Sequence, residues 1–510
     1  MIINEISLMK YRFSKSVSTL SWLKSSKNMS LLVLLFAVLS IVSCKKSSTD
    51  SSSTSTDSSY NTLFIPPTIT GTTFNLTLAK SSKQFFKSGA ATTTYAYNGQ
   101  NIWGPTLIMN KGDNVQINVT NGLNDTTTVH WHGFHIPAKM DGGPHQKIAP
   151  AATWSPNFTI MNNASTYWYH PHLHEKTFEQ LTMGAGGLII IKDAAEAALN
   201  LPRTYGTDDI PLVLTSRRFN SDNSFDVTSH AYGDYALVNG TLSAQVSLPQ
   251  QYVRFRILNA ETERAYNLGF SDNRTFYVIG NDGGLLNTPV SVTRLVMGVG
   301  ERYEILVNLG NDAVGSNIAL KAYNTKQAFG FPGAEPASSG EFGSLLNNKD
   351  FQLLRINVTA PTASAVTSVP TTLANSTYWK ASDATTSITT AINGGQGGSA
   401  FYFDNNYYNY NTFNHTIPLN SIVNWSFSGG NIFGHSIHIH DVQFNIVSRS
   451  QGTIAAYEKG WKDTYFIHLG ETVSVVAKFD DFADTTSPFM YHCHFPNHED
   501  AGLMGQFIVK

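Results

Sequence analysis

Cysteine is nearly absent from this chain of 510 residues: only Cys44 and Cys493 occur. A scaffold built from several disulfides is therefore excluded. Charge is also scarce, with 14% charged residues and a formal net charge of −2, so the basic face expected of a nucleic-acid-binding protein is missing. No long stretch has helical periodicity, and Val, Thr, Tyr and Phe recur in short runs. These features favour a β-rich protein, long enough for about three domains.

The longest apolar run, Leu31 to Val42, is shorter than the ~20 residues that a membrane-spanning helix needs. Five basic residues precede it, and Ser43 and Cys44 follow. This order predicts a secretory signal over residues 1–44, and it resembles the lipobox of bacterial lipoproteins, in which Cys44 would carry the lipid. An ordinary signal peptide and an uncleaved signal anchor are the alternatives. Residues 45–62 are rich in Ser and Thr and are expected to form a flexible tether. A lipidated Cys44 leaves Cys493 as the one thiol of the mature chain, free for another task.

Short alternating segments predict half-buried strands along the rest of the chain. Val115, Ile117 and Val119 alternate with polar residues, and Tyr252–Asn259 and Ser421–Phe427 have the same pattern. Only Ala194–Leu199 is expected to form a helix, and a short one.

An internal repeat relates the first and last thirds of the chain. Tyr169-His170-Pro171-His172 corresponds to Tyr491-His492-Cys493-His494, and a Gly-rich segment follows each. Upstream lie HWHG at 130–133 and HSIHIHD at 435–441. The middle third has similar strand patterns without the histidines. We therefore expect three related β-sandwich domains at 63–198, 199–358 and 375–510, with a linker at 359–374.

Ten of the 16 histidines fall into four clusters: His130 and His132; His170 and His172; His435, His438 and His440; and His492, His494 and His498. A single His-x-His pair is weak evidence for a metal site, because two imidazoles in the core or on the surface could have the same spacing. Four clusters in matched repeats are much stronger evidence. Imidazoles with one thiolate select copper or zinc, and one structural zinc needs only four ligands. Several metal ions are therefore expected.

Strand geometry gives the spacing a purpose, because side chains at i and i+2 share a face. The pairs in HWHG and HPH are each expected to aim both imidazoles at one site. In His492-Cys493-His494 the thiolate points the other way. A metal on Cys493 is then linked through a few covalent bonds to metals on both neighbouring imidazoles.

In their order and spacing, the four clusters resemble the copper-binding signatures of multicopper oxidases, and the surrounding sequence is similar to bacterial three-domain members such as laccase-like, cuprous and bilirubin oxidases. The resemblance runs from about Gly104 to the C-terminus. It implies an all-β fold of three cupredoxin-like domains and four copper ions per chain. The implied ligands are His435, Cys493 and His498 for type 1 copper; His130 and His438 for type 2; and His132, His170, His172, His440, His492 and His494 for the type 3 pair.

The resemblance also implies that Asp141 and Glu499 deliver protons to the copper cluster. The alternatives are a turn cap for Asp141 and a salt bridge for Glu499. The position of the axial type 1 ligand holds Leu503, which cannot coordinate, with Met504 next to it. The remaining histidines are expected not to bind copper: His135, His145, His174, His230, His415 and His468.

The expected activity is oxidation of a reductant at type 1 copper coupled to reduction of O2 to water. Phenols, aromatic amines and bilirubin-like pigments are the expected reductants of a monomeric protein in the bacterial cell envelope. Cu(I) or another low-valent metal is the alternative, although the ten methionines form no cluster that would suit Cu(I). A copper nitrite reductase would lack the trinuclear ligands, a copper-free envelope scaffold would have lost ligands, and a copper carrier would not need the wiring at Cys493.

Overall fold

The computed structural model describes residues 59–228, 232–338, 340–395, 400–430 and 432–510. Cys44, the predicted signal at 1–44, most of the predicted tether and His230 lie outside them. None of the helices in the described segments is both long and apolar enough to cross a membrane.

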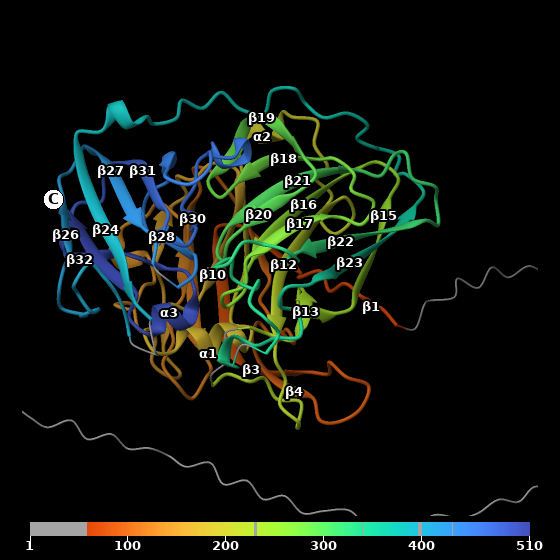
Figure 1. Ribbon diagram of the computed structural model, residues 1–510, viewed down its shortest axis with the longest axis horizontal. Coiled ribbons are helices and arrows are strands. Elements are labelled where there is room, and N and C mark those ends of the chain that lie inside the picture. The colour runs from red at the N-terminus through yellow and green to blue at the C-terminus, as the bar shows by residue number, and fades with distance from the viewer. Residues whose placement is uncertain (1–58, 229–231, 339, 396–399, 431) are drawn as a thin grey trace, which may run out of the picture. The chain divides into compact units, whose positions relative to one another are not determined.

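Strands dominate the fold, and they form six sheets in three successive pairs (Figure 1). The first domain has the sheets β2-β5-β11-β10-β7 and β4-β3-β6-β8, with β9 paired to β6. Its strands are β2 (Thr68–Thr70), β3 (Thr73–Lys83), β4 (Thr92–Tyr97), β5 (Thr106–Asn110), β6 (Asn114–Asn121), β7 (His130–His132), β8 (Thr153–Trp154), β9 (Asn157–Thr159), β10 (Ser165–His170) and β11 (Gly187–Lys192).

The middle domain has the sheets β1-β15-β23-β22-β17-β20 and β14-β13-β12-β16-β21-β18-β19. Its strands are β1 (Asn61–Thr62), β12 (Asp209–Arg217), β13 (Tyr235–Val238), β14 (Thr241–Leu242), β15 (Ala244–Pro249), β16 (Tyr252–Asn259), β17 (Tyr266–Phe270), β18 (Phe276–Asn281), β19 (Gly284–Val292), β20 (Leu295–Met297), β21 (Arg302–Asn308), β22 (Asn317–Tyr323) and β23 (Asp350–Thr359). The end of the predicted tether thus pairs with this domain, because Asn61 and Thr62 lie opposite Ala244 and Gln245.

The last domain has the sheets β25-β24-β27-β31-β29 and β26-β33-β32-β28-β30. Its strands are β24 (Thr386–Gly394), β25 (Phe401–Phe403), β26 (His415–Ile417), β27 (Ser421–Ser428), β28 (His435–Ile439), β29 (Asn445–Arg449), β30 (Thr464–Ile467), β31 (Thr472–Phe479), β32 (Asp484–Cys493) and β33 (Met504–Val509). The helices of the described chain are short: α1 (Thr177–Thr182), α2 (Ala194–Ala197), α3 (Pro496–Asp500) and the 3-10 turns Ala138–Met140, Gly340–Phe342, Ala381–Asp383 and Ala456–Glu458.

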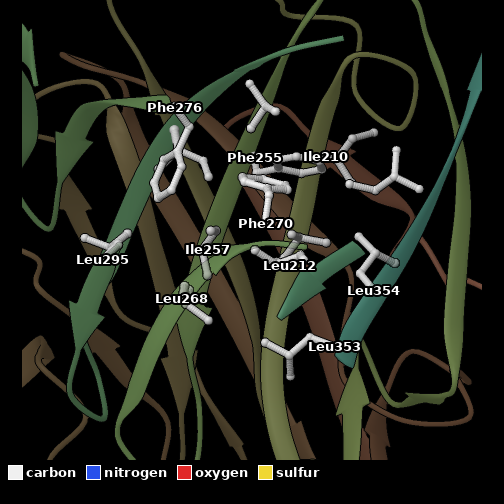
Figure 2. Packing of buried hydrophobic residues seen from close by; sticks show 14 of the residues in the cluster. Ile210, Leu212, Phe255, Ile257, Leu268, Phe270, Phe276, Leu295, Leu353 and Leu354 are labelled. Atoms are coloured by element: carbon white, nitrogen blue, oxygen red, sulfur yellow. The ribbon is translucent and has the colours of Figure 1, made fainter. Parts of the chain in front are cut away.

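Alternation of apolar residues produces these sandwiches. Figure 2 shows the middle-domain core, in which Ile210 and Leu212 of β12 and Phe255 and Ile257 of β16 point into the space between the sheets. Each such side chain contributes about 1.5–3 kcal/mol by leaving water. Separate cores of the same kind fill the first and last domains.

The structure confirms the predicted strands. Residues 114–121, 252–259 and 421–428 are β6, β16 and β27, and β6 buries every second side chain. The expected short helix is α2. Helices α1 and α3, of six and five residues, were not predicted, because such short segments show no helical period.

Candidate metal centre

The two repeats form matching strand pairs that carry the histidine clusters. In the first domain β7 pairs with β10, and His130 lies opposite His170. In the last domain β28 pairs with β32, and His438 lies opposite His492 while Ile437 lies opposite Cys493. Side chains directly opposite each other in an antiparallel pair lie on the same face. Each strand pair therefore presents its imidazoles as one group, and the two groups meet between the first and last domains.

The imidazoles of both domains form three buried sets whose nitrogens face one another. In the first set, His440 Nε2 lies 3.2 Å from His172 Nε2 and 3.3 Å from His492 Nε2. In the second set, His132 Nδ1 lies 3.3 Å from His170 Nε2 and 3.0 Å from His494 Nε2. The third set is a pair of imidazoles, whose nitrogens His130 Nε2 and His438 Nε2 lie 3.4 Å apart.

This arrangement corrects one expectation from the spacing. The two histidines of HPH do not converge on a single site, because His170 and His172 join different sets. In HWHG, the nitrogens of His130 and His132 face different partners, although both lie within 4.8 Å of each other and of His170. A shared strand face fixes their direction, but the imidazole ring is wide enough for neighbours on that face to reach adjacent sites.

Hydrogen-bond acceptors on the outer side of most of these imidazoles determine which ring nitrogen carries the proton. Backbone carbonyls accept from Nδ1 of His130, His170, His438 and His492. Carboxylates lie against the outer nitrogens of His132, His172 and His440. With its proton on the outer nitrogen, each ring turns a lone pair inward. Burial lowers the pKa of six of these rings, that of His172 to about 4, so these six are neutral: His132, His170, His172, His438, His440 and His494. Lone pairs facing each other at 3.0–3.4 Å repel unless cations lie between them, which is the arrangement that a transition-metal cluster requires.

A fourth site lies on the other face of β32. Cys493 Sγ is 3.5 Å from His435 Nδ1 and 3.7 Å from His498 Nδ1. Burial raises the pKa of the thiol and lowers that of His498 to about 3. The ring of Phe401 stacks on His498 with centroids 4.0 Å apart. A neutral set of two imidazole nitrogens and one sulfur in an apolar shell suits copper, whose charge would convert the thiol to a thiolate.

The side chains of Leu503 and Met504 project to opposite faces of the sheet that contains Cys493. Leu503 belongs to the same apolar cluster as Cys493, and its backbone carbonyl accepts from Cys493 N. Met504 lies directly opposite His492 in the β32–β33 pair, so its side chain shares the face of that imidazole. The thioether therefore points away from the sulfur of Cys493.

The two predicted acidic residues lie behind the imidazole sets. Asp141 Oδ2 is 2.6 Å from His440 Nδ1, and its Oδ1 is 3.2 Å from His130 Nδ1. Glu499 Oε1 is 2.9 Å from His172 Nδ1, and its Oε2 is 3.3 Å from His492 Nδ1. Both carboxyl groups are buried, so each is held in contact with two imidazoles rather than with water.

Three further buried residues lie beside the sites and were not found in the sequence: Asp463 and Glu263, which contact imidazoles, and Arg302, which contacts Asp463. Asp463 Oδ1 lies 3.1 Å from His132 Nε2, and Arg302 pairs with Asp463. Glu263 Oε1 lies 3.3 Å from His498 Nε2, and burial raises the pKa of Glu263 to about 8. No motif marks these positions, because each is significant only through the partners that it meets, which lie far from it in the sequence.

The described histidines that were expected not to bind metal lie outside the four sites. His135 lies between Asp441 and Asp481, and His145 contacts Gln506. Aromatic rings neighbour the other three, His174, His415 and His468.

Comparison with known proteins shows which proteins are similar to this chain in sequence and in fold. Three sequence profiles, each described as multicopper oxidase, match residues 79–196, 193–329 and 371–510. A multicopper oxidase of Staphylococcus epidermidis is 30% identical over 86% of this chain and 88% of its own. The cell division protein FtsP of Escherichia coli is 28% identical over 83% of this chain and 87% of its own.

Among solved structures, a laccase-like multicopper oxidase of Ochrobactrum sp., described as active on lignin model compounds and lignosulfonate, is similar with a TM-score of 0.78. The two chains are 29% identical, and the match covers 88% of this chain and 100% of the other. The predicted all-β fold of three consecutive cupredoxin-like domains is thereby confirmed.

Proposed function

Because the chain belongs to the multicopper oxidase family, and is thus a copper-dependent oxidase with O2 as electron acceptor, we propose that it oxidises small aromatic reductants. Phenols, aromatic amines and bilirubin-like pigments are the proposed class. Four electrons and four protons convert one O2 to two molecules of water.

We assign the ligands by the four sets of facing donor atoms. His435, Cys493 and His498 hold type 1 copper, with Leu503 as a non-coordinating axial neighbour. His130 and His438 hold type 2 copper. The type 3 pair is held by two triads: His172, His440 and His492; and His132, His170 and His494. The observation that carries the assignment is the inward orientation of unprotonated nitrogens at 3.0–3.4 Å.

Bound copper supplies the one-electron chemistry of both half-reactions. The chain supplies the connection between them, because Cys493 and its neighbours His492 and His494 are joined by consecutive peptide units. The buried imidazoles exclude bulk water from the cluster. Asp141 and Glu499 each touch the outer nitrogens of two ligands, from which position we propose that they pass protons inward. Asp141→Asn and Glu499→Gln should keep copper but slow reoxidation by O2.

Aromatic reductants are favoured by the surroundings of His498. The ring centroids of Phe401 and Phe433 lie 4.0 and 5.3 Å from the ring centroid of His498. The similarity to a laccase-like oxidase with activity on lignin model compounds agrees with this choice. Cu(I) is the alternative reductant.

Copper content, colour and turnover test the proposal. Copper-loaded protein should hold about four Cu per chain and be blue, and Cys493→Ser should lose the blue colour and the oxidase activity while keeping the cluster copper. Zinc in the purified protein, or near-normal phenol oxidation by the variant, would overturn the assignment. Faster O2 uptake with Cu(I) than with every phenol, aromatic amine and bilirubin tested would favour the alternative reductant.

We propose a lipoprotein of the bacterial cell envelope that acts as a monomer. The support is the sequence around Cys44, after the apolar run and before a Ser/Thr-rich segment. Cys44→Ala should release active protein from the membrane fraction. Attachment that survives the substitution would instead indicate a signal anchor.

A further inference from the structure

Arg302, in the domain without copper ligands, contacts all three domains. It begins β21 and is fully buried. Its Nε donates to the carbonyl of Thr166 in the first domain at 3.1 Å. Nη1 and Nη2 each lie 2.6 Å from one oxygen of Asp463, which precedes β30 in the last domain. A fork of this geometry fixes both the position and the rotation of a carboxylate.

Asp463 in turn contacts two imidazoles of the cluster. Its Oδ1 lies 3.1 Å from His132 Nε2, and its backbone carbonyl accepts from His438 Nδ1 at 2.8 Å. His132 belongs to a type 3 triad and His438 to the type 2 pair. The hydroxyl of Thr464 lies 3.0 Å from His132 Nε2 and 3.2 Å from His438 Nδ1, and it donates to Asp463 Oδ1 at 2.9 Å. The carboxylate of Asp463 therefore also sets the position of the hydroxyl that reaches both rings.

The pair of Arg302 and Asp463 is the inner end of a buried ionic network. Asp282 accepts from Arg302 N at 2.8 Å and pairs with Lys462 Nζ at 2.9 Å, and Lys462 pairs with Glu301 at 2.9 Å. Three carboxylates thus face two cations, which leaves a net charge of −1. A negative charge behind an imidazole N–H strengthens the imidazole as a donor to a cation on its other nitrogen.

We propose that Arg302 is a positioning residue for the trinuclear copper cluster, acting through Asp463 on His132 and His438, so that the copper-free middle domain is part of the metal site. This inference rests on the ligand assignment of the proposed function. A purely structural ion pair at the domain junction would stabilise the fold without affecting copper retention, and that difference makes the two roles separable.

The test compares copper retention in full-length, copper-loaded proteins under a chelator. Arg302→Met keeps the aliphatic stem but removes the fork, and Arg302→Lys keeps one charge. The matched control is Arg254→Met, because Arg254 is equally buried and pairs with Glu196 and Glu304 without touching a ligand. Copper per chain, the electron paramagnetic resonance of type 2 copper and the blue absorption of type 1 copper are measured.

Arg302→Met should lose cluster copper roughly 10–100-fold faster than wild type while the blue absorption stays, because His435, Cys493 and His498 do not contact the network. Arg302→Lys should be intermediate, and Arg254→Met should retain copper like wild type. Wild-type retention in Arg302→Met, or equal loss in Arg254→Met, would overturn the inference. A wild-type protein that binds no copper would instead refute the proposed function.

Arg302→Met leaves the buried carboxylate of Asp463 unpaired, and this variant could therefore fail to fold. A second variant tests the inference in that case. In Arg302→Met/Asp463→Asn the unpaired charge is gone, and the amide oxygen can still accept from His132. This protein should fold and stay blue but release cluster copper faster than wild type. Wild-type retention there would also overturn the inference.

Discussion

At the scale of single residues, Leu503 decides the character of the proposed type 1 site. Its side chain shares the apolar cluster of Cys493, whereas Met504 lies on the face of His492. A thioether would donate electron density to Cu(II), and an alkyl group cannot. An apolar wall also disfavours the more highly charged oxidised state.

Leu503→Met should therefore lower the type 1 reduction potential, measured by redox titration of the blue absorption. Met504→Leu should change it little and serves as the matched control. A large shift from Met504→Leu with none from Leu503→Met would mean that the loop is displaced and Met504 is axial.

Gly300 is a second residue on which the cluster depends. Its φ is +85°, and a Cβ there would lie 2.8 Å from Cγ of His494. Gly300→Ala should therefore combine about 1–2 kcal/mol of backbone strain with displacement of that imidazole. We expect loss of cluster copper with the blue colour retained, measured by metal analysis and absorption.

Gly315→Ala is the control for the strain alone, because Gly315 has φ +89° and no atom within 4 Å of its Cβ position. Copper content that falls equally in both variants would assign the effect to backbone strain and not to His494.

At the scale of elements, His135 joins the loop after β7 to the segments after β28 and β31. Its Nδ1 lies 2.9 Å from Asp441 and its Nε2 3.1 Å from Asp481. Burial alone would lower the pKa of His135, but the hydrogen bonds to Asp441 and Asp481 outweigh it and raise the pKa to about 11. The first and last domains are thus linked by an imidazolium.

A raised pKa gives stability that is complete below the unfolded value of about 6.5 and declines as pH rises toward the folded value. The loss of unfolding free energy in His135→Asn should therefore be largest near pH 6.5 and shrink toward about pH 10, by no more than about 1.4 kcal/mol per pH unit. Denaturant unfolding of both proteins at several pH values measures this. A difference that is constant or grows with pH would contradict the link.

The elements also mark how far the sequence could predict the site. Alternation located β6, β16 and β27, and the clusters identified the imidazoles that meet. Periodicity gives the face of a strand but not the strand across the domain interface, so the division of His170 and His172 between two sets was not predictable. Arg302 and Asp463 were invisible for the same reason, because their importance lies only in which residues they meet.

At the scale of the whole molecule, the cluster is a junction between distant parts of the chain. Its imidazoles come from residues 130–172 and 438–494, with the middle domain between them in sequence. A metal bound to both ends stabilises the native arrangement, because the unfolded chain does not hold the ligands together.

Removing copper with a chelator should therefore lower the midpoint temperature of thermal unfolding. Where free copper exceeds Kd 100-fold, bound copper should contribute about 2.7 kcal/mol or more to the free energy of unfolding. Differential scanning calorimetry of the loaded and stripped protein measures it. Copper-loaded Cys493→Ser keeps the cluster ligands, so its midpoint temperature should fall less than that of the stripped wild-type protein. An unchanged midpoint on stripping would mean that copper does not join the domains.

The position of β1 has a mechanical consequence. Asn61 and Thr62 run parallel to Ala244 and Gln245 of β15, in the domain that carries no proposed copper ligand. Tension applied to the chain from its N-terminal side would be taken up by this short ladder as shear, and through it by the middle domain. The strands that carry Cys493 and the histidine sets lie outside that line of force. A pull that detaches β1 from β15 would lengthen the free N-terminal segment and leave the proposed copper ligands undisturbed.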